Sequence, residues 1–556
     1  MLLPGNFLRR VAGCGLGVGN NGGGGIGGGS RALSFLRGRR RVSVTHGHSH
    51  IKSHKSHDCH DIGQQRRMIQ SLLARHKCVT VGLGSLESSS SSVTALSTAE
   101  LKKRVISAVA QSLRVSSTDD AAVVLVSRSL APWLEDQAFM AELLEATTIS
   151  EDEAGTGREL SVLSAAVDEV PQFQGAPSSS EGLSVLRGSA IRVLPGLWEV
   201  GSNHQTSSSP SSSFPQQQPS FLEFRLPGLQ PKAAEPLQVT VPLANTIFTT
   251  GKPHALFASK WRHDPAAAAR KGLSMAASVD KTTQTILLPG HDQVPSKSSA
   301  STVYTALVPV TRPHKIVAGL GNILRQVEVG VKPEPASKEL EAIIPTLLKK
   351  RLEHSESDEL TYSGPVGVWA LIMPKDTVDQ FPILNPLDVE NYDPSNEWDL
   401  VYQTSHAMDG LIAAGCQLRK ILSGGGGWGL KQGLLSLDPN TRYAREEHED
   451  MESFIRSFKG EDATGGIVTP GSYVQFLTEV IPPTETTRPK LAWPSDCPTF
   501  AIGTSGGKTS GEVETFPNLF GAVSSEGVYI SSEENKAMTT KLDAPQSFVV
   551  SHASEQ

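Results

Sequence analysis

The sequence predicts an α/β protein in which mixed sheets are flanked by helices, arranged in two parts. Helical and strand-like segments alternate along the chain, which is typical of layered α/β domains. Short, continuous apolar runs such as residues 121–127 indicate strands that are buried on both faces. The chain has 556 residues, 38% of them hydrophobic, and is long enough for two to four domains.

Helices and strands are expected to alternate in the first part. Ser97 and Glu100 form a capping box, which starts a helix. Apolar residues follow at helical spacing, at Leu101, Val105, Val109 and Leu113. A second helix is predicted over residues 132–147, and strands over 121–127, 159–167 and 182–190. Residues 202–220 are rich in Ser, Pro and Gln, so we expect a disordered insert there.

The second part is predicted to contain two helices among short strands. One helix is expected from Ser337 to about Leu352, interrupted or kinked at Pro345. The other is expected over residues 405–422. Strands are predicted over 366–373, 433–438, 472–480, 499–502 and 527–531.

The N-terminus is basic and contains no acid. Residues 1–57 contain nine Arg and Lys residues, and the first carboxylate is Asp58. An Arg-rich, acid-free N-terminus is typical of a mitochondrial presequence, which we expect over residues 1–45. The protein is therefore expected in the mitochondrial matrix; the alternative is a disordered basic tail.

A His-rich basic linker is expected over residues 46–76. Six imidazoles within fifteen residues can bind Zn, Ni or Cu adventitiously. We expect a solvated linker and no functional metal site, because nothing around it indicates a fold that fixes ligands. The histidines are His46, His48, His50, His54, His57 and His60.

Charge and apolar content exclude some classes of protein. After residue 57 the chain has 42 basic residues against 57 acidic ones, a net charge of about −15. Nucleic-acid binding as the main task is not expected, because phosphate contacts need a basic face. No apolar run approaches the length of a spanning helix, so we expect a soluble protein. The five cysteines form no CxxC pair, which suits a reducing compartment.

Three blocks in the second half resemble the FIST domain family. "VAGLGNILRQVEVG" (317–330) precedes Pro335-Ala336 and a helix, as at the start of the family's C-terminal half. "GLLSLDPNTRY" (433–443) is similar to its apolar strand ending in Asp-Pro. "GGIVTPGSYVQFL" (465–477) resembles its turn-and-strand block. The N-terminal half departs from the family, because "LSVLSAAVDEV" stands where a small-residue Gly-Cys segment often lies.

The resemblance implies a two-part FIST-like domain that stands alone, without an F-box. Its halves would span residues 77–315 and 316–535, followed by a polar tail over 536–556. The family is regarded as a sensory or ligand-recognition module, with small molecules such as amino acids proposed as ligands. The resemblance therefore implies a non-enzymatic protein that binds a small molecule or recruits a protein partner, without a cofactor. A scaffold in a mitochondrial assembly is one alternative.

Two glycine-rich loops resemble phosphate-binding loops but depart from the pattern. In residues 423–432, Leu430 and Gln432 break the P-loop spacing, and the expected helix precedes the loop instead of following it. "FAIGTSGGKTSGE" (500–512) contains Gly-Lys-Thr after a strand and also fits G-x-S-x-G. No apolar helix follows, and His552 is the only later histidine. An enzyme that uses Gly503–Thr509 for an anion or acyl group is the second alternative.

Polar residues in "LANTIFTTGKPHALFASKWRHD" (243–264) are candidates for binding a carboxylate-bearing ligand. The alternative is a strand–turn–strand with a basic exposed edge. The family's Gly321-Asn322 turn and the Gly503–Thr509 loop add further candidates. The full set is Asn245, Lys252, His254, Lys260, Asn322, Ser505 and Lys508.

Overall fold

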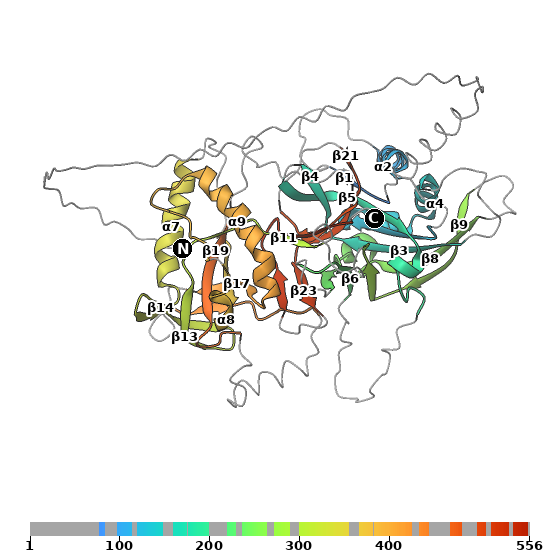
Figure 1. The fold of residues 1–556 in the computed structure, drawn as a ribbon. Coiled ribbons are helices and arrows are strands. Elements are labelled where there is room, and N and C mark those ends of the chain that lie inside the picture. Colours follow the sequence, from blue (N-terminus) through green and yellow to red (C-terminus); the bar gives the residue numbers. More distant parts are fainter. Residues whose placement is uncertain are drawn as a thin grey trace, which may run out of the picture. The chain divides into compact units, whose positions relative to one another are not determined.

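Figure 1 shows the computed structural model, in which all described residues belong to the unit Arg66–Gln556. The presequence, the His-rich linker, residues 202–219 and Lys508 lie outside the described residues. The described residues are 77–83, 97–113, 119–147, 159–174, 176–199, 220–229, 236–263, 272–289, 300–354, 366–381, 383–424, 433–443, 467–480, 497–506, 513–532 and 538–553.

The first sheet has the order β21-β1-β5-β2-β3-β8-β9, with β4 paired to β5 alone. Only β2 and β3 are parallel; the other pairs are antiparallel. The predicted strand over 121–127 is confirmed as β2, buried throughout. The strands are β1 (Cys78–Leu83), β2 (Ala121–Ser127), β3 (Glu159–Val167), β4 (Val170–Gln174), β5 (Ala176–Gly188), β8 (Leu256–His263), β9 (Leu273–Asp280) and β21 (Val513–Pro517).

Helices cover one face of this sheet. The capping box is confirmed: the Ser97 side chain accepts the Glu100 N–H, and the Glu100 carboxylate accepts the Ser97 N–H. The helix predicted over 132–147 is confirmed except at Asp136, where the chain breaks and the carboxylate caps a second helix. The helices are α2 (Thr98–Ser112), η1 (Arg128–Leu130), α3 (Ala131–Glu135) and α4 (Gln137–Ala146).

Two further sheets combine N- and C-terminal strands. One has the order β10-β6-β7-β23-β24 and the other β11-β25-β20-β22. Through β21 and β23, the end of the chain pairs with β1 and β7. Their elements are α5 (Ala190–Val193), β6 (Phe221–Leu226), β7 (Leu237–Pro242), α6 (Ile247–Thr250), β10 (Thr283–Leu287), β11 (Thr302–Tyr304), β20 (Thr499–Thr504), β22 (Leu519–Ser524), β23 (Val528–Ser532), β24 (Thr539–Leu542) and β25 (Phe548–His552).

The polar tail expected over residues 536–556 is wrong for residues 538–553. Two strands, β24 and β25, lie there and are almost entirely buried. Phe548, Val549 and Val550 are completely buried, so this segment belongs to the core although its neighbours in the sequence are polar.

The remaining strands pair in a closed ring of six, β13-β14-β18-β17-β16-β19. Strands β12 and β15 attach to β19 and β14. Figure 1 shows α7 and α9 on the strands of the ring. The elements are β12 (Leu307–Pro309), β13 (His314–Leu320), β14 (Ile323–Val329), β15 (Lys332–Pro335), α7 (Lys338–Glu353), β16 (Val368–Met373), α8 (Lys375–Val378), α9 (Pro394–Ala413), β17 (Gln417–Gly424), β18 (Leu435–Leu437) and β19 (Tyr473–Glu479).

Two helix predictions in this region have different outcomes. The helix from Ser337 to about Leu352 is confirmed as α7, with Pro345 inside it. The helix over 405–422 is wrong, because α9 ends at Ala413 and Gly415 turns the chain with a positive φ of 85°. Residues 417–424 then form strand β17, in which Leu418 is buried.

The coarse fold prediction is confirmed: the chain has mixed sheets flanked by helices and belongs to the α/β class. No helix among the described residues combines the length and apolar character needed to cross a membrane.

Candidate functional site

Asn245, Lys252 and His254 flank helix α6, and each makes a contact within the fold. The Asn245 side chain accepts the Ile247 N–H at 3.1 Å. Lys252 pairs with Glu135 at 3.3 Å, and the His254 Nδ1 lies 3.2 Å from the Ala244 carbonyl oxygen. These contacts hold the turn between β7 and β8.

Lys260 and Asn322 lie on different sheets and also make structural contacts. Lys260 is on β8, where its Nζ lies 3.5 Å from a Glu159 carboxylate oxygen and 4.8 Å from the Trp198 ring centre. Asn322 is in the turn between β13 and β14 and donates to the Leu437 carbonyl at 2.8 Å. The structure therefore does not bring the six predicted residues that it describes together in one site.

Ser505 follows β20, next to carboxylates. The Gly506 N–H donates to the Ser179 hydroxyl at 3.4 Å, and this hydroxyl donates to Glu169 at 2.5 Å. Burial raises the pKa of Glu169, and the nearby Asp168 adds to this rise. A developing anion is disfavoured beside these carboxylates.

A Ser–His pair at this loop is excluded by strand register. His552 lies opposite Thr499 in the antiparallel pair of β20 and β25. Thr499 starts β20, whereas Ser505 follows its end, so the two side chains are separated by about 20 Å of strand. His552 instead contacts the Thr499 hydroxyl at 3.0 Å.

The "GLLSLDP" stretch forms a structural junction. Lys541 on β24 pairs with Asp438 at 3.0 Å and with Asp543 at 3.5 Å. Asp543 in turn accepts the Trp369 indole N–H at 2.7 Å. All four side chains are largely buried, so this network joins β16 and the end of β18 to β24.

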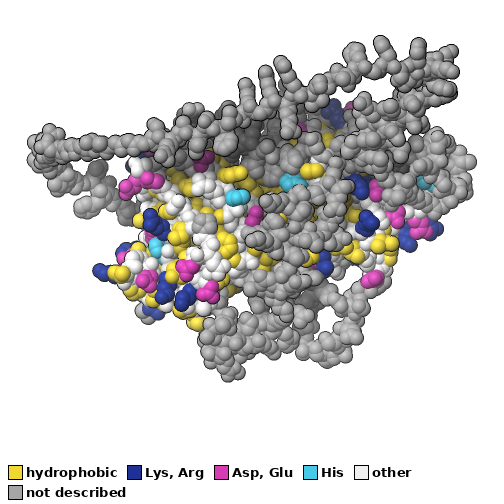
Figure 2. All heavy atoms as spheres, in the orientation of Figure 1, with side chains coloured by type: hydrophobic (Ala, Val, Ile, Leu, Met, Phe, Trp, Pro, Cys, Tyr) yellow, Lys and Arg dark blue, Asp and Glu magenta, His cyan; other side chains and the backbone are white. Residues whose placement is uncertain are grey.

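The three family-like blocks lie next to one another in the ring of strands. The first block forms the β13–β14 hairpin, the second contains β18 and the third contains β19. Strand β14 pairs with β18, and β13 pairs with β19. In the orientation of Figure 2, acidic and basic side chains are interspersed on the surface at this end, to the left.

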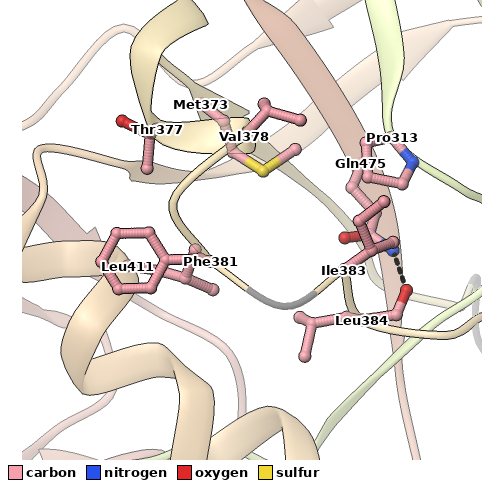
Figure 3. A pocket seen from close by; sticks show the side chains of 9 residues that line it. All are labelled: Pro313, Met373, Thr377, Val378, Phe381, Ile383, Leu384, Leu411 and Gln475. Atoms are coloured by element: carbon pink, nitrogen blue, oxygen red, sulfur yellow. Dashed lines mark hydrogen bonds between the residues drawn. The ribbon is translucent and has the colours of Figure 1, made fainter.

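Two hollows border the connection between β12 and β13, and they contact different apolar clusters. The smaller is apolar, holds only about 10 Å³, and is lined by Met373, Phe381, Leu384 and Leu411 (Figure 3). Its volume is close to that of a single water molecule. The Gln475 side chain donates to the Leu384 carbonyl at 2.7 Å (Figure 3). It also donates to the Thr311 carbonyl at 2.9 Å, which joins the two connecting loops.

The larger hollow is a groove of about 330 Å³, which we call the α7 groove. The first turns of α7, the β12–β13 connection and the loop over 386–390 form its walls. Its apolar side chains include Val310, Ile343 and Leu387, which pack in the cluster that holds α7 on the ring. Its volume lies at the lower end of the range for small-molecule sites.

Charged side chains of both signs line the α7 groove. Arg312 and His314 come from the β12–β13 connection, Glu339 from α7, and Asp388 and Glu390 from the loop. The His314 Nε2 lies 2.7 Å from a Glu339 carboxylate oxygen. Arg312 is exposed and pairs with no carboxylate among the described residues.

The loop carboxylates are held in place by backbone groups. Asp388 accepts the backbone N–H groups of Glu390 and Asn391 at 3.1 Å. Hydrogen bonds from the side chain and the backbone of Asn391 lower the pKa of Asp388. Asp388 therefore stays ionised and fixes the turn that carries Glu390. Among the described residues, no group of three His, Cys, Asp or Glu side chains is placed to bind a metal ion.

The sequence-based site prediction missed the α7 groove. Its three walls are far apart in the chain, and only the order of the strands brings them together. One local signal was present, because "TRPH" interrupts an apolar run between two short strands with a cation and an imidazole. No protein-family model, curated protein or solved structure matches this chain.

Proposed function

We propose that this protein is a non-enzymatic, FIST-like recognition module that binds a small molecule in the α7 groove. The observation that supports this is a solvent-open groove of about 330 Å³. It is lined by the His314–Glu339 pair and by Arg312, which pairs with no carboxylate in the part of the chain that the structure describes. With a presequence at its N-terminus, the protein would act in the mitochondrial matrix.

A free amino acid is the ligand class that suits this lining best. A carboxylate is recognised well by a guanidinium, which offers paired donors in a fixed plane. Arg312 is available for this contact, while Asp388 and Glu390 on the opposite loop offer acceptors for an ammonium group. Val310, Ile343 and Leu387 offer apolar contacts for a side chain.

The alternative of an enzyme acting at Gly503–Thr509 has less support. Asp168 and Glu169 lie near the start of this loop and oppose an anion. Neither hollow described above borders Ser505. A scaffold or partner-recruiting role is the alternative that the binding experiment separates from ours.

A thermal-shift screen of the twenty amino acids on the full chain tests the proposal. We expect at least one of them to raise the melting temperature, because a ligand that binds the folded state stabilises it. Arg312→Gln should remove that rise. Arg325→Gln is the matched control, since Arg325 is also exposed, on the neighbouring strand β14, and does not line the groove.

Calorimetric titration then measures the affinity of each compound that shifts the melting temperature. If no amino acid binds, or if Arg312→Gln leaves binding unchanged, the α7 groove is not the amino-acid site. Co-purification of one stable protein partner in that case would favour the scaffold.

A further inference from the structure

His314 uses one ring nitrogen for Glu339 and leaves the other without a hydrogen bond to any described residue. The Nε2 contact with the Glu339 carboxylate is short, at 2.7 Å. A carboxylate can only accept, so the Nε2 atom carries the hydrogen. The Glu339 contact thus fixes which tautomer the neutral ring adopts.

The tautomer decides what the second nitrogen can do. In the neutral ring, Nδ1 has a lone pair and no hydrogen, so it repels a carboxylate oxygen. In the imidazolium form both nitrogens donate, and Nδ1 can then donate to a carboxylate while Nε2 keeps Glu339. A carboxylate that contacts this ring therefore requires an added proton.

We infer that His314 binds the ligand's carboxylate only as an imidazolium, so that ligand binding to the α7 groove takes up one proton. This inference rests on the proposed function and adds its regulation. Affinity should rise as the pH falls through the titration range of histidine, by up to about tenfold per pH unit.

Charged groups face His314 from each wall of the groove. Glu339 on α7 contacts the ring directly, and Asp388 and Glu390 on the loop add negative charge. Arg312, on the same connection as His314, is the cation of the lining. A bound carboxylate would add a negative charge beside the ring and so promote proton uptake.

Histidine NMR on the full chain tests the inference with simple probes. We label the imidazole Cε1 atoms, assign the His314 signal with His314→Gln, and follow it from about pH 5 to pH 8. Sodium acetate, methylammonium chloride and sodium chloride are compared at equal ionic strength. We expect acetate to raise the titration midpoint of His314 above its value in chloride, and methylammonium not to raise it.

His254 and His354 serve as internal controls, because neither lines the groove. A His314 midpoint that acetate leaves unchanged, or that moves equally for all three histidines, overturns the inference. Glycine titrations in two buffers of different ionisation enthalpy count the protons taken up. Binding of glycine without proton uptake overturns the inference and leaves the proposed function standing. Failure of every amino acid to bind overturns the proposed function. In that case the acetate titration still decides the role of His314.

Discussion

The two ends of helix α7 each carry an acid–base pair, and the pairs differ in their access to water. At the first turn Glu339 pairs with His314, and their side chains are 33% and 11% exposed. At the last turn Arg351 pairs with Glu397 of α9, and these side chains are only 3% and 4% exposed. The acid lies at the N-terminus and the cation at the C-terminus, where the helix dipole favours each.

Because of this difference in exposure, a ligand can contact the His314–Glu339 pair, whereas the Arg351–Glu397 pair stabilises the fold. Arg351 donates to Glu397 through two nitrogens and to the Glu479 carbonyl, while the Tyr392 hydroxyl donates to Glu397 at 2.6 Å. No ligand can enter this pair without leaving a charge unpaired in the interior. His314 and Glu339 instead line the open α7 groove, and Glu339 is a third exposed, so a ligand in the groove can reach this pair.

Removing Glu397 should have the largest effect on stability. Glu397→Ala leaves the Arg351 guanidinium buried without its carboxylate and the Tyr392 hydroxyl without its acceptor. We expect the free energy of unfolding to fall by about 3–5 kcal/mol, measured by urea titration followed by circular dichroism.

Glu353→Ala is the matched control, because Glu353 is the last residue of α7, close to Arg351, and its side chain is 46% exposed. Its contacts with Lys349 and Lys350 are 3.8 Å long, so we expect a change below about 1 kcal/mol. Equal losses in both variants would mean that the Arg351–Glu397 pair does not hold α7.

Asp409 sharpens the comparison, because it is a mostly buried acid on α9 that pairs with no cation among the residues that the structure describes. Burial raises its pKa to about 7, although the Val303 N–H, 2.5 Å from its carboxylate, acts in the opposite direction. Since the folded-state pKa lies above the unfolded value, folding is favoured by protonation. The stability that Asp409 contributes is therefore fully present at low pH and is lost as the pH rises from about 4 to 7.

Asp409→Asn should remove this pH dependence, because the amide oxygen still accepts the Val303 N–H and carries no charge. We expect the variant to be more stable than the native chain by about 4 kcal/mol near pH 8, and nearly equal to it near pH 4. Asp399→Asn on the same helix is the control and should change neither end of the pH range. Parallel pH profiles for the native chain and Asp409→Asn would show that Asp409 is ionised at low cost.

Local signals in the sequence predicted strands β2, β3, β19, β20 and β23 close to their observed bounds, but missed β24 and β25. The capping box of Ser97 and the apolar run of β2 act within a few residues, so they are visible in the sequence. Strands β24 and β25 are short. Strand β24 pairs with its neighbour β23, whereas β25 pairs with β11, which lies far away in the chain. A glycine with positive φ, Gly415, separates α9 from β17, and no apolar periodicity marks that change.

The candidate site was less predictable for a related reason. We predicted ligand-binding residues in the glycine-rich loops and in the polar segment after Leu243, because residue types suited to binding lie together there in the sequence. The α7 groove instead combines Arg312 and His314 with Glu339 and the loop at Asp388, which meet only because β12, β13 and α7 share one cluster. The spacing of these residues in the sequence does not show that they lie together unless the strand order is known.

Neutralising Glu339 should have the smallest effect on stability. Glu339→Gln keeps an oxygen that can accept the His314 Nε2–H, and it removes a charge that water already screens. We expect a change in unfolding free energy below about 1 kcal/mol. Glu397→Gln makes the same chemical change at the buried pair and should cost clearly more, because Arg351 stays charged in the interior. Urea titrations of the two variants compare the ends of α7 directly. A Glu339→Gln loss as large as that of Glu397→Gln would mean that His314 and Glu339 hold the fold together, and that no ligand can share their hydrogen bonds.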